Sequence, residues 1–179
     1  MNASPRAILD FWFKETDAKF WFAEDAGFDA RIRERFLSAW TTARDGGLQD
    51  WKSHVDGALA LVILFDQFSR NMFRGKAEAF SADALARAVA DRAIRHHFDL
   101  EVPKGARAFS YMPFMHSENL ADQDHSLVLF AERVGRDSVN YPYAVQHRDI
   151  IARFGRFPAR NAALGRKSTP DELEFLKRN

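Results

Sequence analysis

Eight consecutive apolar residues, Ala58–Phe65, lie in the middle of a segment with helical signals. Ser53, followed three residues later by Asp56, resembles a capping box and predicts the start of a helix that runs to about Arg70. A helix that is apolar nearly all round is stable only when other elements cover it on every side. The sequence therefore predicts one central, buried helix with the rest of the chain packed around it.

Helical periodicity recurs through the rest of the chain, whereas strand patterns do not. Ser4 before Pro5 is typical of a helix start, and Gly46 with Gly47 is typical of a helix end. Helices are expected over about residues 4–13, 25–44, 53–70, 81–97, 105–113, 119–134 and 139–154, with a last one from Ser168. The predicted fold class is all-α, an array of about eight helices in antiparallel hairpins.

Composition indicates a single helical domain over residues 1–179. The chain has 46% hydrophobic and 28% charged residues, a normal globular balance, and it shows no linker, low-complexity tract or clean repeat. With 17 Phe and 4 Trp, the core is expected to be built on aromatic rings. The absence of cysteine excludes disulfides, thiolate catalysis and cysteine-held metal centres.

Charge and hydropathy bear on location and partners. A net charge of +1 gives no overall field for nucleic acid or an anionic membrane, so neither is expected as a partner. The N-terminal stretch lacks a basic region followed by an apolar one, and the longest apolar run is far shorter than a membrane span. We expect a cytoplasmic protein without a cofactor, and its oligomeric state stays open.

Four motifs, taken in their order along the chain, resemble a known family. They are LFDQFSRNMFRG, FSYMPFMHSEN, HRDIIARFGRFPARN and LGRKSTPDELEFL, and the similarity extends from ILDFWF to the end. The chain is similar to the bacterial family of unknown function called DUF924. This resemblance implies a helical fold grouped with the tetratricopeptide-like superhelices, and it implies no established activity. In the family pattern a histidine follows the Phe157–Pro158 step, whereas this chain has Ala159, so no role of that histidine carries over.

The first candidate site lies at the end of the central helix and comprises Asp66, Arg70, Asn71 and Arg74. Asp66 and Arg70 are four residues apart, so they share a helix face and can form an ion pair. One interpretation is a salt bridge that closes the helix. The other is an arginine held rigid by Asp66 so that its guanidinium faces a ligand.

The second candidate site is the stretch MHSENLADQDH, in which we single out His116, Glu118 and Asn119. Its histidines and carboxylates match neither a helical His-Glu-x-x-His pattern nor an EF-hand loop, so no metal is expected. Glu118 or Asn119 could cap the next helix, with Asp122 in its first turn. Alternatively these side chains line a polar pocket, in which His116 would exchange a proton near neutral pH.

The third candidate site lies in residues 147–166, which hold five arginines with glycine and proline between them. Proline makes a continuous helix doubtful beyond Phe157, and a tight turn would bring arginines and asparagine together. Guanidinium groups bind carboxylates and phosphates bidentately, so such a cluster suits a small anion. The alternative is pairing with carboxylates of the chain itself. The candidate residues are His147, Arg148, Arg156, Arg160 and Asn161.

These patterns favour a helical binding module with a polar, arginine- and histidine-lined pocket or groove for a small anionic ligand or a peptide. One alternative is an enzyme that acts on a small phosphorylated or carboxylated metabolite, with His116 or His147 in acid–base work. Another is a self-associating structural protein whose polar clusters are internal ion-pair networks. We expect Arg70, His116 and Arg156 to converge in space, because polar side chains concentrate at these three points.

Overall fold

The structure is a computed structural model that describes residues 4–178. Within that range the regular elements are all helical and no strand occurs, so the predicted all-α class is confirmed. The contacts gather in two compact units, Met1–Arg74 with Glu78–Pro113, and Gly75–Ala77 with Phe114–Asn179. The single domain and the tetratricopeptide-like superhelix stay predictions.

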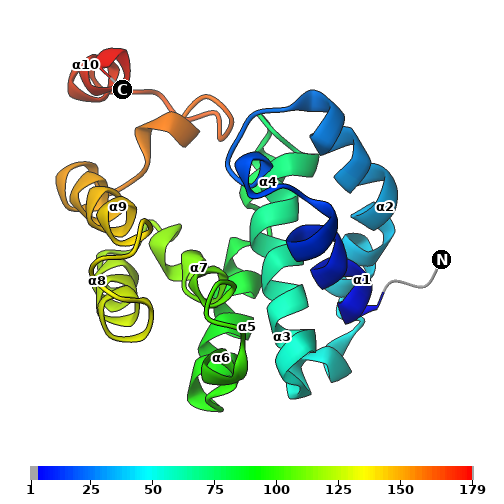
Figure 1. Cartoon of the computed structure of the whole chain (residues 1–179). Coiled ribbons are helices and arrows are strands. Elements are labelled where there is room, and N and C mark those ends of the chain that lie inside the picture. The colour runs from blue at the N-terminus through cyan, green and yellow to red at the C-terminus, as the bar shows by residue number, and fades with distance from the viewer. Residues whose placement is uncertain (1–3, 179) are drawn as a thin grey trace. The chain divides into compact units, whose positions relative to one another are not determined.

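The first unit is built around α3 (Val55–Val62), as the apolar run predicted (Figure 1). Every residue in Gly57–Val62 is buried. α1 (Pro5–Asp10) and α5 (Asp83–Arg95) pack against this helix. α3 is therefore the element that the rest of this unit covers.

α3 continues into α4 (Ser69–Met72) through a π-helical turn, Ile63–Phe68. α2 (Ala26–Arg44) packs against α4 and the turn. π-Helical turns are rare in proteins, and those that occur often lie at functional sites. This one carries Asp66, which is 1% exposed. The other regular segments of the unit are α6 (Phe98–Glu101), the π-helical turn Phe11–Glu15, and the 3-10 turns Ala18–Phe20, Gln49–Ser53 and Arg107–Ser110.

Aromatic rings fill the core of the first unit, as the composition predicted. The ring of Phe36 lies 4.9 Å from that of Phe68 and 5.1 Å from that of Phe11, measured between centroids. Trp40 is also buried, and its indole Nε1–H donates to Ser69 Oγ at 2.7 Å. The indole thus keeps a hydrogen-bond partner inside an otherwise apolar core.

The cap predicted at Ser4 is confirmed, the capping box predicted at Ser53 is wrong, and the helix predicted from about residue 25 also begins at a capping residue. Ser4 Oγ accepts from the N–H of Ala7 at 3.2 Å, and Asp25 Oδ1 accepts from Phe28 N–H at 2.7 Å. The capping box predicted at Ser53 is wrong: the N-cap of α3 is His54, which makes no capping bond with its side chain. Ser53 instead belongs to the 3-10 turn Gln49–Ser53. This turn packs the backbone of the buried Trp51 against Gly57 in the first turn of α3, and that packing decides where the helix starts.

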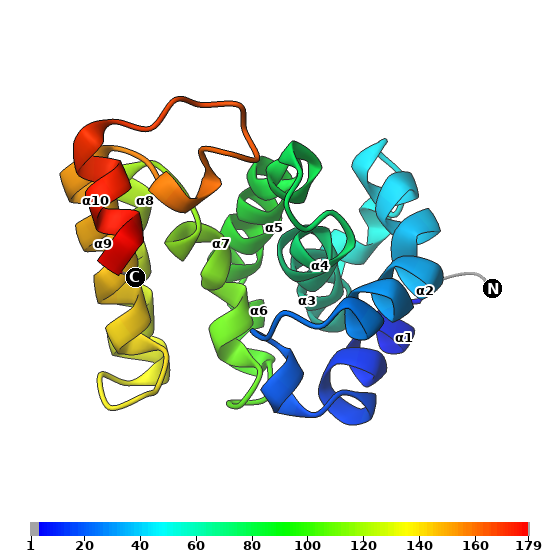
Figure 2. The same ribbon diagram turned by 90° about the horizontal axis from the view of Figure 1, so that it is seen from above.

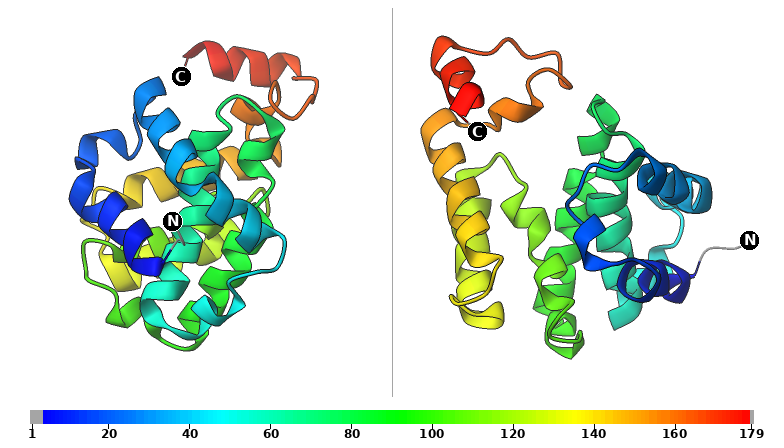
Figure 3. Two further views of the ribbon diagram at one scale, coloured as in Figure 1. Left: turned by 90° about the vertical axis from the view of Figure 1, so that its right-hand side faces the viewer. Right: turned by 45° about the horizontal axis from the view of Figure 1, so that its top comes forward.

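The second unit is a helical hairpin followed by a last helix. α8 (Leu120–Leu129), extended by the π-helical turn Phe130–Val134, packs against α9 (Tyr141–Phe154) (Figure 2). α10 (Pro170–Arg178) lies near the C-terminal end of α9 (Figure 3). The division between the two units falls within α7 (Met112–Met115) and within the 3-10 turn Ala77–Phe80. The second unit also contains the 3-10 turn Pro158–Arg160. In residues 4–178 no helix has the length and apolar character needed to cross a membrane.

We predict that Gly57→Ala destabilises the first unit. Alanine is the better helix former by about 1 kcal/mol, so an unconstrained site would gain stability. A Cβ at position 57 would overlap the backbone carbonyl of Trp51, however, and the backbone has to move. We expect a net loss of about 1–3 kcal/mol in the free energy of unfolding, measured by urea titration with circular dichroism.

Gly105→Ala is the matched control, because a Cβ there meets no heavy atom within 4 Å. It should leave the urea midpoint close to that of the wild type. A Gly57→Ala protein as stable as the control would contradict the close approach of Trp51.

Candidate functional site

The chain reverses direction at the end of α9, and this turn positions the third predicted site. Gly155 has a φ of 68° and donates its N–H to the carbonyl of Ile151 at 2.8 Å. Glycine adopts this left-handed conformation at no steric cost, which is why it ends helices. The 3-10 turn Pro158–Arg160 then begins, and Arg156 comes to lie against the start of α10.

Arg156 binds Glu172, a buried carboxylate of α10. Its Nε donates to Glu172 Oε1 at 2.6 Å and its Nη2 to Oε2 at 2.8 Å, so the pair is bidentate. Thr169 completes the arrangement: its N–H donates to Glu172 Oε2 at 2.7 Å, and its Oγ1 accepts from the N–H of Glu172 at 3.2 Å. This reciprocal pair is a capping box that starts α10.

The surroundings of Glu172 hold it in the ionised form. Its side chain is 2% exposed, and a buried carboxylate is tolerated only when it is paired and hydrogen-bonded. The guanidinium of Arg156, followed by the N–H of Thr169, lowers the pKa of Glu172 from 4.5 to about 2. Glu172 therefore remains charged, and its bonds to Arg156 remain intact, far below neutral pH.

A second bidentate pair joins Glu118 to Arg166. Arg166 Nη1 donates to Glu118 Oε2 at 2.6 Å, and Nη2 donates to Oε1 at 2.9 Å. The N–H of Phe157 also donates to Oε1, at 2.8 Å. Burial opposes ionisation of Glu118, but the bonds from Arg166 and Phe157 outweigh it and hold its pKa below the ordinary value.

Asn161, 1% exposed, connects the two pairs. Its Oδ1 accepts from Arg166 Nε at 3.0 Å, and its Nδ2 donates to Glu172 Oε2 at 3.3 Å and to Ser168 Oγ at 3.0 Å. The loop before α8, the turn after α9 and the start of α10 are thus joined by one hydrogen-bonded network. We call it the Glu172 network; it consists of Glu118, Arg156, Asn161, Arg166 and Glu172.

His116, His147 and Arg160 meet beside Phe157. The centroids of the two imidazole rings are 6.0 Å apart, and the ring of His147 lies 5.3 Å from that of Phe157. Arg160 Nη2 donates to the carbonyl of His116 at 2.8 Å, and the guanidinium lies 4.5 Å from the centre of the Phe157 ring. His147 Nδ1 is 2.8 Å from the carbonyl of Tyr143, which can only accept, so Nδ1 carries a proton.

Asn119 and Arg148 have structural partners. Asn119 is the N-cap of α8, with its Oδ1 accepting from Ala121 N–H at 2.8 Å, and Asp122 lies in the first turn, so the capping interpretation is confirmed. Arg148 Nε donates to Asp124 Oδ1 at 2.9 Å on the surface of the α8–α9 hairpin.

The candidate residues of the first unit also form ion pairs. Arg70 lies 3.2 Å from Asp66 Oδ1, as predicted, and makes a bidentate pair with Asp83 at 3.0 and 3.2 Å. Burial opposes the charge of Arg70, but the two carboxylates outweigh it and raise its pKa. The carboxylate of Asp29 accepts hydrogen bonds from the other two candidate residues. Asn71 Nδ2 donates to it at 2.7 Å, and Arg74 donates to it at 2.6 and 2.9 Å.

The guanidinium groups of Arg70, Arg74, Arg148 and Arg156 are therefore held by carboxylates of their own unit. The structure brings His116, Arg156 and their neighbours together within the second unit. The convergence of Arg70 with them stays a prediction, and so does ligand binding by the candidate residues.

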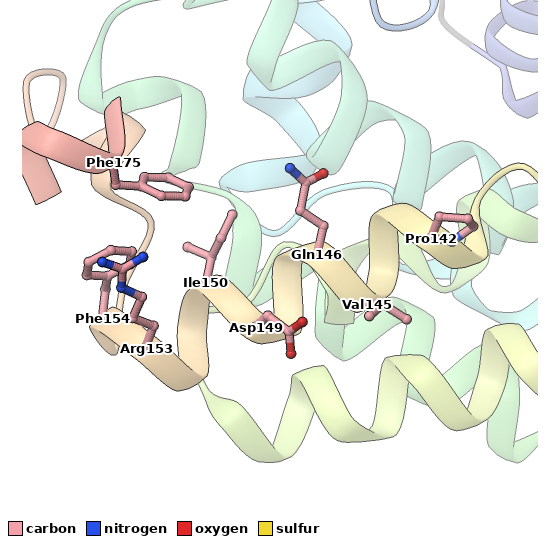
Figure 4. A pocket seen from close by; sticks show the side chains of 8 residues that line it. All are labelled: Pro142, Val145, Gln146, Asp149, Ile150, Arg153, Phe154 and Phe175. Carbon is pink, nitrogen blue, oxygen red and sulfur yellow. The ribbon is translucent and has the colours of Figure 1, made fainter. Parts of the chain in front are cut away.

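A groove runs along the solvent-facing side of α9 and is closed at one end by α10 (Figure 4). Its volume is about 370 Å³. Ile150 and Phe154 of α9 and Phe175 of α10 supply its apolar wall, with the rings of Phe154 and Phe175 5.2 Å apart. The full lining is Pro142, Val145, Gln146, Asp149, Ile150, Arg153, Phe154 and Phe175.

Arg153 differs from the arginines around it. Its guanidinium lies over the ring of Phe154, 4.6 Å from the centre, and among residues 4–178 it has no ion pair. Asp149, one helical turn earlier, is 68% exposed, and its nearest cation is Arg148 at 3.7 Å. The groove thus combines an apolar wall with one acidic and one basic side chain.

In the part of the chain that the structure describes, residues that could hold a metal are not grouped together. Within residues 4–178 no set of three or more histidine, aspartate and glutamate side chains is arranged to hold an ion. The two histidines that do approach each other, His116 and His147, stand beside Arg160, a cation that would repel a metal.

The sequence interpretation did not include the groove residues or two members of the Glu172 network. Thr169 with Glu172 three residues later is a capping-box pattern, which could have marked Glu172. α9 is apolar on two sides, with Ile151 buried on one side and Ile150 lining the groove on the other, and this departure from a single apolar stripe could have marked the groove.

Fold and site together define an all-helical protein whose second unit carries an open groove beside a partly buried ion-pair network. The chain belongs to the family described as "Bacterial protein of unknown function (DUF924)", which matches residues 8–179, and the resemblance of the motifs is thereby confirmed. A solved structure of a protein of unknown function from Agrobacterium tumefaciens is similar, with 40% identity over 98% of this chain and 97% of that chain, and a TM-score of 0.92. No curated protein matches the chain.

We predict that Glu172→Gln destabilises the second unit in a pH-dependent way. The folded pKa of Glu172, about 2, lies below the ordinary 4.5, so the carboxylate contributes stability above pH 4.5 and loses that contribution as the pH falls towards 2. The wild type should be the more stable protein at neutral pH. The gap in urea midpoint between the two proteins should narrow between pH 4.5 and 2.

Glu174→Gln on the exposed side of the same helix is the control, because the partners of Glu174 within residues 4–178 are the exposed Lys177 and Arg178. It should change the midpoint little at any pH. A gap for Glu172→Gln that stayed constant down to pH 2 would contradict the ionised, buried state of this carboxylate.

Proposed function

We propose that the protein is a helical binding module and that the α9–α10 groove binds a peptide segment of a partner protein. The single observation that carries the proposal is the composition of the groove. It offers an apolar wall of Ile150, Phe154 and Phe175 next to polar side chains that can fix orientation. Binding sites in proteins generally combine a concave apolar surface with a few polar groups in this manner.

A peptide fits this groove better than a small anion does. The lining contributed by α9 extends from Pro142 to Phe154, roughly 18 Å at 1.5 Å per residue, which is long for a small metabolite. The arginines that the sequence suggested for anion binding are mostly held by carboxylates, and a ligand would have to displace those partners. The groove contains an arginine, Arg153, that needs no such displacement.

We also propose that the protein works in the cytoplasm. The sequence has no cysteine and therefore cannot form the disulfides that are common in small proteins of oxidising compartments. Fractionation of cells that express a tagged copy would test the location.

The binding proposal predicts the outcome of a peptide selection. Random peptides displayed on phage are selected on immobilised wild-type protein, and the enriched peptides are synthesised. Ile150→Arg places a charge in the apolar wall and should weaken their binding by at least about ten-fold, since burying an unpaired charge is unfavourable. Dissociation constants come from fluorescence anisotropy.

Val128→Arg is the matched control, because Val128 is an apolar residue of α8, 49% exposed, that does not line the groove. It should bind the selected peptides as the wild type does. Equal affinity for the Ile150→Arg protein would place the peptide site elsewhere, and a selection without enrichment over bare matrix would count against a peptide-binding function.

A further inference from the structure

We infer that the groove takes an amphipathic helix that runs antiparallel to α9 and carries an acidic residue four positions before a basic one. The inference rests on the proposed function and names the kind of segment bound. Shape, charge and direction each contribute one part of it.

Shape favours a helix over an extended segment. The residues that α9 presents to the groove recur at spacings of one, three and four, which is the surface pattern into which the side chains of another helix fit. An extended peptide that binds by strand addition needs the edge of a sheet, and the described part of the chain contains no strand. The distance from Pro142 to Phe154 corresponds to about three helical turns.

Charge supplies the recognition. Asp149 and Arg153 are one turn apart, and neither has a strong partner of its own. Arg153 lies over Phe154, and the cation nearest to Asp149, Arg148 at 3.7 Å, is already bound to Asp124 at 2.9 Å. A bound helix can therefore offer a carboxylate to Arg153 and an ammonium to Asp149 without breaking a close ion pair.

Direction follows from the order of these two charges. In an antiparallel helix the residue opposite Arg153 comes four positions before the residue opposite Asp149, so the acidic residue precedes the basic one. That order also stabilises the free helix, because glutamate four residues before lysine is the favourable arrangement. A parallel helix would need the reverse order of charges. Its dipole would also point in the same direction as that of α9, so that ends of like partial charge would meet.

Two peptides and two proteins test the inference. Both peptides are capped, alanine-rich helices with leucines on the binding face; one has Glu four residues before Lys, and the other has these two residues exchanged. The proteins are the wild type and the double variant Asp149→Lys with Arg153→Glu. Both positions are solvent-exposed, and circular dichroism and the melting temperature verify that the variant folds.

We expect the wild type to bind the Glu-before-Lys peptide about ten-fold more tightly at low ionic strength, and the double variant to prefer the other peptide. The intrinsic helicity of each peptide acts equally on both proteins, so the reversal reports the charges of the groove. Anisotropy of a terminal dye gives the dissociation constants.

The other outcomes overturn the inference in distinguishable ways. If both proteins bind both peptides equally, and Ile150→Arg abolishes binding, the charge pattern is wrong while the groove remains a peptide site. If the wild type binds neither helix but does bind peptides from the selection, the occupant is not a helix. If sedimentation shows a wild-type dimer that Ile150→Arg separates, a second copy of the chain fills the groove.

Discussion

The ion pair between Arg156 and Glu172 determines where the last helix lies, and the groove depends on that position. α10 has nine residues, too few for a helix that is stable in isolation. It is anchored at its first turn by Arg156, Asn161 and Thr169, and further along by the contact of Phe175 with Phe154. Without the polar anchor, the apolar wall of the groove would lose the ring that α10 contributes.

The same pairing explains why so many cations in a short stretch do not form an open anion site. A guanidinium with a bidentate carboxylate has its strongest donors occupied, and removing one partner of a buried pair leaves an uncompensated charge. Arg156 and Arg166 are in this state, with Glu172 and Glu118. Arg153 points outward from α9 and rests on an aromatic face, an interaction much weaker than a buried ion pair. Arg153 can therefore change partner at low cost.

Local signals in the sequence predicted the helices well. The continuous apolar run placed the central helix, and Ser4 and Asn119 cap their helices as their positions suggested. The prediction at Ser53 failed because packing, which local spacing does not encode, decides that start: the carbonyl of Trp51 lies against Gly57. π-Helical turns escaped prediction for a similar reason, since one inserted residue hardly changes the apolar pattern.

The candidate site was predicted in part. The pairing of Asp66 with Arg70 follows from a spacing of four, and the turn at Gly155 follows from glycine and proline. The partners of Arg156 and Arg166 could not be assigned, because 16 residues separate Arg156 from Glu172 and 48 separate Arg166 from Glu118. Charge alone does not select among many possible carboxylates. Only the tertiary fold makes that selection.

Anchoring α10 at its start has a mechanical consequence for the groove. The Glu172 network holds the first turn of the helix, whereas Phe175 lies nearly one turn further on, and Leu176 beyond it is 38% exposed. A segment bound between Ile150 and Phe175 would add apolar contacts to this part of α10, so binding and the ordering of the helix would reinforce each other. The buried pair fixes the position of the wall, and the bound segment would complete its packing.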